Sequence, residues 1–136
     1  MTDIASSRRV LLVEDDDDLR TTLAEMLGEA GFDVVQAANG QIALEQLKTQ
    51  EAPQAIILDL MMPGMNGWEF RLDQRRDPAL GATPVVVISA DSRAEARAID
   101  ADLYVTKPFE MRKLLDGLGR VLALGERRRF AERVAG

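Results

Sequence analysis

The 136-residue chain contains no cysteine and no histidine. The lack of cysteine excludes a disulfide scaffold, a thiolate zinc site and a cysteine nucleophile. The lack of histidine removes the most frequent general base, the commonest metal ligand and any phosphohistidine carried by the chain itself. No apolar run reaches the roughly 18 residues that a membrane span needs, and residues 1–7 lack signal-peptide character. We therefore expect a cytoplasmic protein that does not bind membranes.

The charge balance is acidic, with 23 Asp and Glu side chains against 17 Lys and Arg and a net charge of -6. This balance argues against non-specific binding of nucleic acid, so no direct nucleic-acid partner is expected. Hydrophobic residues make up 46% of the chain and charged residues 29%, which is typical of a folded domain. The pattern predicts one domain over residues 8–124, a lead-in over residues 1–7, and an arginine-rich tail or helix extension over residues 125–136.

The arginine-rich tail is open to two interpretations. Positive charge suits the end of a helix and its dipole, so the tail can be a solvated helix end. It can also be a docking patch for an acidic partner.

Short apolar runs alternate with segments of helical periodicity. The strands are expected at residues 10–13, 32–37, 55–58, 85–88 and 103–106. Helices are expected between them, including a short fourth helix at about residues 93–99 and a last helix after Pro108. Five such alternations with short connections predict an α/β fold, in which helices cover both faces of a parallel sheet.

Polar side chains follow four of the five expected strands at the point where each of the four ends. They are Glu14 and Asp15 after the first strand, Asp59 after the third, Ser89 after the fourth and Lys107 after the fifth. Ligands of open α/β sheets bind beyond the carboxyl ends of the strands, so these side chains should converge. Two carboxylates about 4 Å apart repel by roughly 4 kcal/mol at an effective dielectric near 20. Mg²⁺ would relieve that repulsion, a carboxylate such as Asp59 can form an aspartyl phosphate, and a lysine can neutralise the transferred group.

Four stretches resemble the receiver domain of response regulators, of the chemotaxis-regulator type. They are VLLVEDD at residues 10–16, LDLMMPGMNG at 58–67, VISA at 87–90 and KPF at 107–109. The resemblance covers about residues 8–124 and implies a flavodoxin-like, doubly wound, five-stranded parallel sheet of order 2-1-3-4-5 with five helices. Lys107 follows Ser89 by 18 positions, fewer than the family commonly shows, so the fourth helix should be shortened by about a turn.

The resemblance assigns the acidic residues their roles. Asp59 would be the phosphoacceptor. Mg²⁺ (or Mn²⁺) would be bound by Asp15, Asp59 and the backbone carbonyl of Met61, with Glu14 acting through ordered water.

The resemblance also implies which residues surround the phosphoryl group. Lys107, Ser89 and Ala90 would stabilise or adjoin it, and the Lys107–Pro108 bond would be cis. Ser89 and Tyr104 would form the switch, although a buried core tyrosine explains Tyr104 nearly as well.

The implied function is that of a stand-alone receiver in a two-component phosphorelay. A sensor histidine kinase or a histidine phosphotransfer protein would donate the phosphoryl group, and an unknown downstream protein would detect it. The chain would be no enzyme beyond its own Mg²⁺-dependent phosphorylation and dephosphorylation. The alternative is a receiver-like interaction module that works without phosphorylation. A phosphatase is disfavoured, because the position two after Asp59, where phosphatases carry a second aspartate, is Met61.

The third helix departs from the family pattern. Arg71 and Gln74 stand where helical spacing calls for apolar residues, while Phe70 and Leu72 alternate as in a strand. The helix could therefore be short or distorted, or its polar positions could meet a partner.

Overall fold

The computed structural model describes residues 8–60, 67–77, 81–90 and 101–135. Its centre is a parallel sheet of five strands in the order β2-β1-β3-β4-β5, the order that the sequence resemblance implies. The strands are β1 (Arg9–Val13), β2 (Asp33–Ala37), β3 (Ala55–Asp59), β4 (Val85–Ser89) and β5 (Leu103–Thr106). All positions of β3 and β4 are buried, because helices cover both faces of the sheet.

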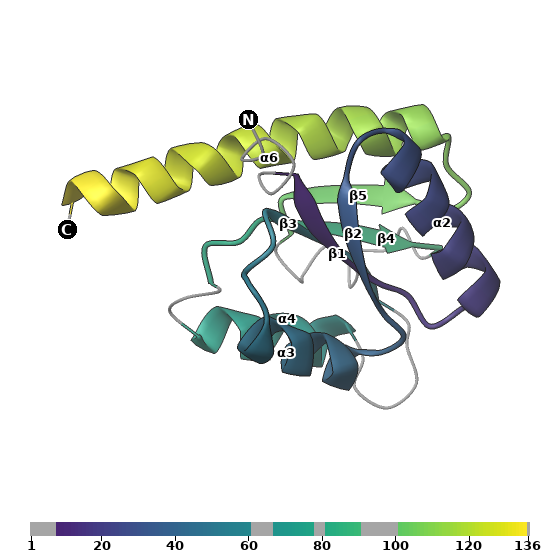
Figure 1. Ribbon diagram of the computed structural model, residues 1–136, viewed down its shortest axis with the longest axis horizontal. Coiled ribbons are helices and arrows are strands. Elements are labelled where there is room, and N and C mark those ends of the chain that lie inside the picture. Colours follow the sequence, from purple (N-terminus) through teal and green to yellow (C-terminus); the bar gives the residue numbers. More distant parts are fainter. Residues whose placement is uncertain (1–7, 61–66, 78–80, 91–100, 136) are drawn as a thin grey trace.

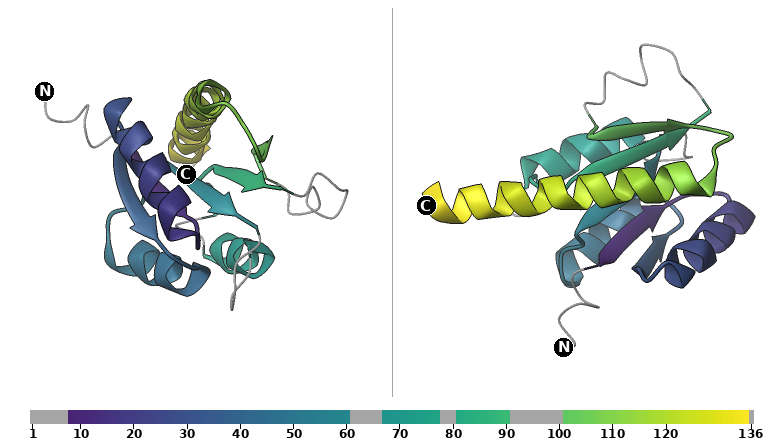
Figure 2. Two further views of the ribbon diagram at one scale, coloured as in Figure 1. Left: turned by 90° about the vertical axis from the view of Figure 1, so that its right-hand side faces the viewer. Right: turned by 90° about the horizontal axis from the view of Figure 1, so that it is seen from above.

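Helices lie on both faces of the sheet (Figure 1). Within the described residues they are α2 (Asp17–Glu29), α3 (Gly40–Thr49), α4 (Gly67–Arg76) and α6 (Met111–Ala135). α3 and α4 lie side by side on one face, and α2 and α6 lie on the other (Figure 2). The expected fourth helix, at about residues 93–99, lies outside the described residues.

The core has two layers, one on each face of the sheet. The α3 and α4 side is closed by Ala43, Leu47 and Phe70, and the other side by Leu23, Leu27, Leu114 and Leu118. No helix of the described ranges is both long and apolar enough to cross a membrane.

Local sequence signals fix where the helices begin and end. Asp16 caps α2, since its Oδ1 atom accepts a hydrogen bond of 3.0 Å from the backbone N–H of Leu19. Asn39 caps α3 in the same way through Ile42. Such side-chain oxygens satisfy N–H groups that a helix start leaves without partners. Gly31, with φ of 99°, ends the first of these helices in the left-handed region that glycine tolerates best.

The third expected helix, α4, is regular over ten residues, which removes the alternative that it is short or distorted. Its buried residues include Phe70, Arg71 and Gln74, whereas Leu72 is exposed. Arg71 donates to Gln74 Oε1 at 2.6 Å, and Gln74 donates to the carbonyl of Thr83 at 3.2 Å. The helix therefore keeps helical spacing, and its polar positions contact this chain.

The last helix, α6, continues through the arginine-rich tail as far as Ala135 and runs past the sheet (Figure 1). Arg128 of this extension lies 2.6 Å from Asp102 Oδ1. The other carboxylate oxygen of Asp102 accepts a 2.9 Å hydrogen bond from the N–H of Val85, at the start of β4. One tail arginine therefore anchors the helix to the sheet, and docking of an acidic partner by the tail stays a prediction.

Candidate phosphoryl and metal site

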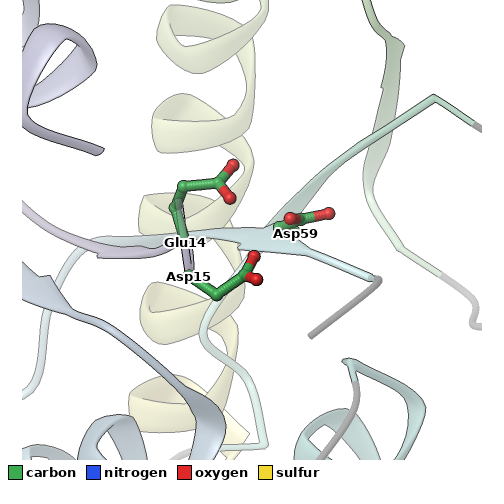
Figure 3. A group of neighbouring side chains, drawn as sticks. All are labelled: Glu14, Asp15 and Asp59. Carbon is green, nitrogen blue, oxygen red and sulfur yellow. The ribbon is translucent and has the colours of Figure 1, made fainter. Parts of the chain in front are cut away.

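Three carboxylates meet at the carboxyl edge of the sheet. Glu14 and Asp15 directly follow β1, and Asp59 is the last residue of the neighbouring β3. One oxygen from each carboxylate lies within 4.8 Å of the other two. Figure 3 shows the three side chains leaving the two adjacent strand ends. The parallel register, which sets Val13 beside Leu58, brings the residues that follow to the same level.

Lys107, the residue after β5, adds a positive charge to these carboxylates. Its Nζ atom lies 3.2 Å from Glu14 Oε1 and 3.5 Å from Asp59 Oδ2. The backbone N–H of Lys107 donates to the carbonyl of Ser89 at 2.8 Å, which ties the lysine to the end of β4. The Lys107–Pro108 peptide bond is cis, as the resemblance implied.

Burial and like charge act together on Glu14. Its side chain is 1% exposed, and desolvation, followed by the hydrogen bond to Asp59 and the charge of Asp59, raises its pKa from 4.5 to about 7. The N–H of Asp16 and the charge of Lys107 act in the opposite direction but do not cancel the rise. A carboxylate cluster of this kind favours either a proton or a metal cation.

The pKa of Lys107 is governed by opposing causes. Burial lowers the pKa, but the carboxylates of Asp59 and Glu14 outweigh burial, and the pKa is raised above its usual 10.5. The ammonium group is therefore charged at neutral pH and supplies a fixed positive charge next to Asp59.

The donor set fits Mg²⁺. This ion binds oxygen ligands at about 2.0–2.1 Å in an octahedron, so two oxygens bound to it lie about 3–4 Å apart. One carboxylate oxygen each of Glu14, Asp15 and Asp59 lies within 4.8 Å of the other two, which is close to that spacing. Hard oxygen donors without nitrogen or sulfur suit Mg²⁺ or Mn²⁺. Met61, the fourth expected ligand, lies outside the described residues.

The remaining predicted site residues lie around this cluster. Ser89 is buried at the end of β4, next to the exposed Ala90. Tyr104 is half-buried against the core layer of α3 and α4, and its hydroxyl accepts a 3.1 Å hydrogen bond from the N–H of Ala101. This placement suits both a core tyrosine and a switch, so the role of Tyr104 stays a prediction.

Arg20 is a residue of the site that sequence reasoning missed. It lies in the first turns of α2 and donates to the backbone carbonyl of Glu14 at 2.9 Å. Its other terminal nitrogen lies 2.6 Å from Asp17 Oδ1. The available signal was its position three residues after Asp17, which permits a helical ion pair.

The family model for the response regulator receiver domain matches residues 10–118. The chain belongs to this family. The receiver domain resembles the regulatory protein VanRB of Enterococcus faecalis, with 42% identity over 113 residues, 80% of this chain and 50% of VanRB. The chain thus spans about half the length of the first curated relatives it matches.

Solved structures agree with this assignment of a receiver domain. The chemotaxis protein CheY4 of Vibrio cholerae matches with a TM-score of 0.77 and 32% identity, over 83% of this chain and 97% of CheY4. The response regulator TrrA of Thermotoga maritima, in complex with Mg²⁺ and BeF, matches with a TM-score of 0.75 and 29% identity, over 84% of this chain and 98% of TrrA.

Proposed function

We propose that this receiver domain accepts a phosphoryl group on Asp59 with the help of Mg²⁺. The observation that carries the proposal is the position of Lys107 Nζ, 3.5 Å from Asp59 Oδ2 and beside two further carboxylates. A carboxylate nucleophile, a cation site and a fixed ammonium group together meet the needs of phosphoryl transfer. Binding of Mg²⁺ and BeF by a relative with 29% identity supports the same chemistry.

The proposed step is a transfer to a carboxylate oxygen. An oxygen of Asp59 attacks phosphorus, and the bond from phosphorus to the leaving group breaks, with its electron pair going to the leaving group. In a histidine kinase or histidine phosphotransfer protein, the leaving atom is a nitrogen of the imidazole. Lys107 offsets charge on the transferred oxygens, and Ser89 donates a hydrogen bond to one of them. A metal ion held by Asp15 and Asp59, with Glu14 acting through ordered water, would supply further charge neutralisation.

Signalling would follow from the phosphorylated state. Phosphorylation would bias a two-state surface through Ser89 and Tyr104, and a downstream protein would recognise one of the states. No turnover of a separate substrate is expected, and a cytoplasmic location stays a prediction. The interaction-module alternative had support from the polar positions of α4. That support is weakened, since Arg71 and Gln74 contact this chain.

Beryllofluoride, a stable mimic of the phosphoryl group, tests the site without a partner kinase. We expect fluorine NMR to show bound beryllofluoride only when Mg²⁺ is present, and no bound signal in Asp59→Asn. The matched control is Asp33→Asn, which removes an exposed carboxylate at the start of β2 and should leave binding unchanged. Absence of a bound beryllofluoride signal in the wild-type protein with Mg²⁺ would favour the interaction module instead.

A further inference from the structure

The backbone that carries Glu14 and Asp15 is held from both sides by contacts from other elements. The N–H of Glu14 donates to the carbonyl of Ala37, at the end of β2, at 3.1 Å. The carbonyl of Glu14 accepts from Arg20 of α2 at 2.9 Å. That carbonyl belongs to the peptide unit that joins Glu14 to Asp15, and a peptide unit is planar. The position of the Arg20 guanidinium therefore fixes the plane of the peptide bond that precedes Asp15.

Two contacts hold the Arg20 side chain in one orientation, so that it acts as a rigid strut between α2 and the end of β1. Its side chain is 15% exposed, and its second terminal nitrogen is held by Asp17, which belongs to the same helix. A guanidinium presents its donors in a fixed plane, so the two contacts together define its orientation. The strut connects the start of α2 with the end of β1, on either side of the turn that carries the acidic residues.

We infer that Arg20 is a positioning residue for the metal site, which it serves by fixing the peptide that orients the Asp15 carboxylate. The inference rests on the proposed function, because it assumes that Asp15 binds a metal. Groups that orient metal ligands typically contribute about 10- to 100-fold to metal affinity. Arg20 touches neither the phosphoryl group nor the metal in this account and acts through the Glu14 carbonyl.

Electrostatics alone predicts the opposite effect, which makes the inference testable. Arg20 is a cation near a cation site, so its removal by itself should strengthen the binding of Mg²⁺. If the arginine acts by orientation, its removal should weaken binding despite the relief of repulsion. The sign of the change therefore separates the two effects.

The experiment is calorimetric titration of the full chain with Mg²⁺ alone, without phosphodonor. Arg20→Met keeps much of the aliphatic chain and removes both contacts, and we expect its Kd for Mg²⁺ to rise about 10-fold or more. Arg76→Met is the matched control, since Arg76 also pairs with an aspartate three residues earlier, on the exposed side of α4. Its Kd should equal that of the wild type. Thermal unfolding confirms that each variant is folded, and Arg20→Gln replaces the methionine variant if that one does not fold.

Each outcome bears on a different statement. A weaker affinity in the Arg20 variant, with the Arg76 variant unchanged, supports the positioning role. An equal or tighter affinity in the Arg20 variant overturns it and leaves the proposed function intact. An equal loss in both arginine variants also overturns it, because the loss would then reflect the removal of any arginine. Absence of Mg²⁺ binding in the wild type would instead overturn the proposed function itself.

Discussion

Lys107 Nζ lies 3.5 Å from Asp59 Oδ2, although Lys107 follows β5 and Asp59 ends β3, and β4 lies between these two strands. The same ammonium group reaches Glu14 Oε1 at 3.2 Å. One lysine thus neutralises part of a cluster that contains three carboxylates. Lys107 is thus a counter-ion of these carboxylates in the metal-free protein, and a bound Mg²⁺ would neutralise the same carboxylates.

Lys107→Met should strengthen the binding of Mg²⁺ and slow phosphoryl transfer. Removal of the ammonium group leaves the carboxylates with less positive charge, so Mg²⁺ should bind several-fold more tightly. Phosphorylation by acetyl phosphate should slow by about 100-fold, because the charge beside the transferred group is lost. Calorimetry measures the first effect and intact-mass kinetics the second. Weaker Mg²⁺ binding in the variant would contradict the counter-ion role.

The raised pKa of Glu14 predicts how stability depends on pH in the metal-free protein. The carboxyl has a pKa of about 7 when folded and 4.5 as its ordinary value, so the folded state holds more protons between these pH values. The stabilising contribution of Glu14 is therefore complete below pH 4.5 and is lost as the pH rises through about 7. Urea unfolding in EDTA measures this effect. In Glu14→Gln, the free energy of unfolding should lose this part of its dependence on pH. An unchanged dependence in that variant would contradict the raised pKa of Glu14.

Asp102 and Arg128 should contribute unequally to stability, although they form one ion pair. Asp102→Ala leaves the buried N–H of Val85 without its carboxylate acceptor and should lower the free energy of unfolding by about 1–3 kcal/mol. Arg128→Met removes the half-exposed partner and should cost about 0–1 kcal/mol. Urea unfolding compares the two variants. A larger loss from the arginine variant would show that the ion pair, and not the backbone contact, dominates.

Two glycines of α6 should respond differently to alanine. A Cβ atom at Gly117 would collide with a terminal methyl carbon of Leu103, a half-buried side chain on β5 that would have to shift. The cost of that shift offsets the helix-propensity gain, so Gly117→Ala should lower the free energy of unfolding by about 0–2 kcal/mol. Gly119 has open space around it, and Gly119→Ala should stabilise the helix by up to about 1 kcal/mol. Thermal unfolding of the pair tests the close approach of α6 to β5. Equal shifts would contradict that approach.

The sequence predicted the ends of β1, β3, β4 and β5 well, since each of these four joins an apolar run to a polar residue. The parallel sheet then brings Glu14, Asp15, Asp59 and Lys107 together without further information. The caps Asp16 and Asn39 involve only neighbours in the chain, so such contacts are within the reach of sequence analysis.

Side-chain contacts between distant segments, other than those at the strand ends, could not be predicted from the sequence. Gln74 looked misplaced on α4, because the Thr83 carbonyl that it binds belongs to the loop before β4. The pairing of Arg128 with Asp102 depends on α6 extending past the domain. Arg20 escaped notice because its main acceptor is a backbone carbonyl, which every residue has.

Phosphorylation of Asp59 in a reaction that needs Mg²⁺ can be observed by intact-mass spectrometry after incubation with acetyl phosphate. Asp59→Asn and an EDTA-treated sample are measured beside the wild type. We expect one added phosphoryl group in the wild type with Mg²⁺ and none in either of the other samples. A phosphoryl group on the Asp59→Asn variant, or equal labelling in EDTA, would show that Asp59 is not the Mg²⁺-dependent phosphoacceptor.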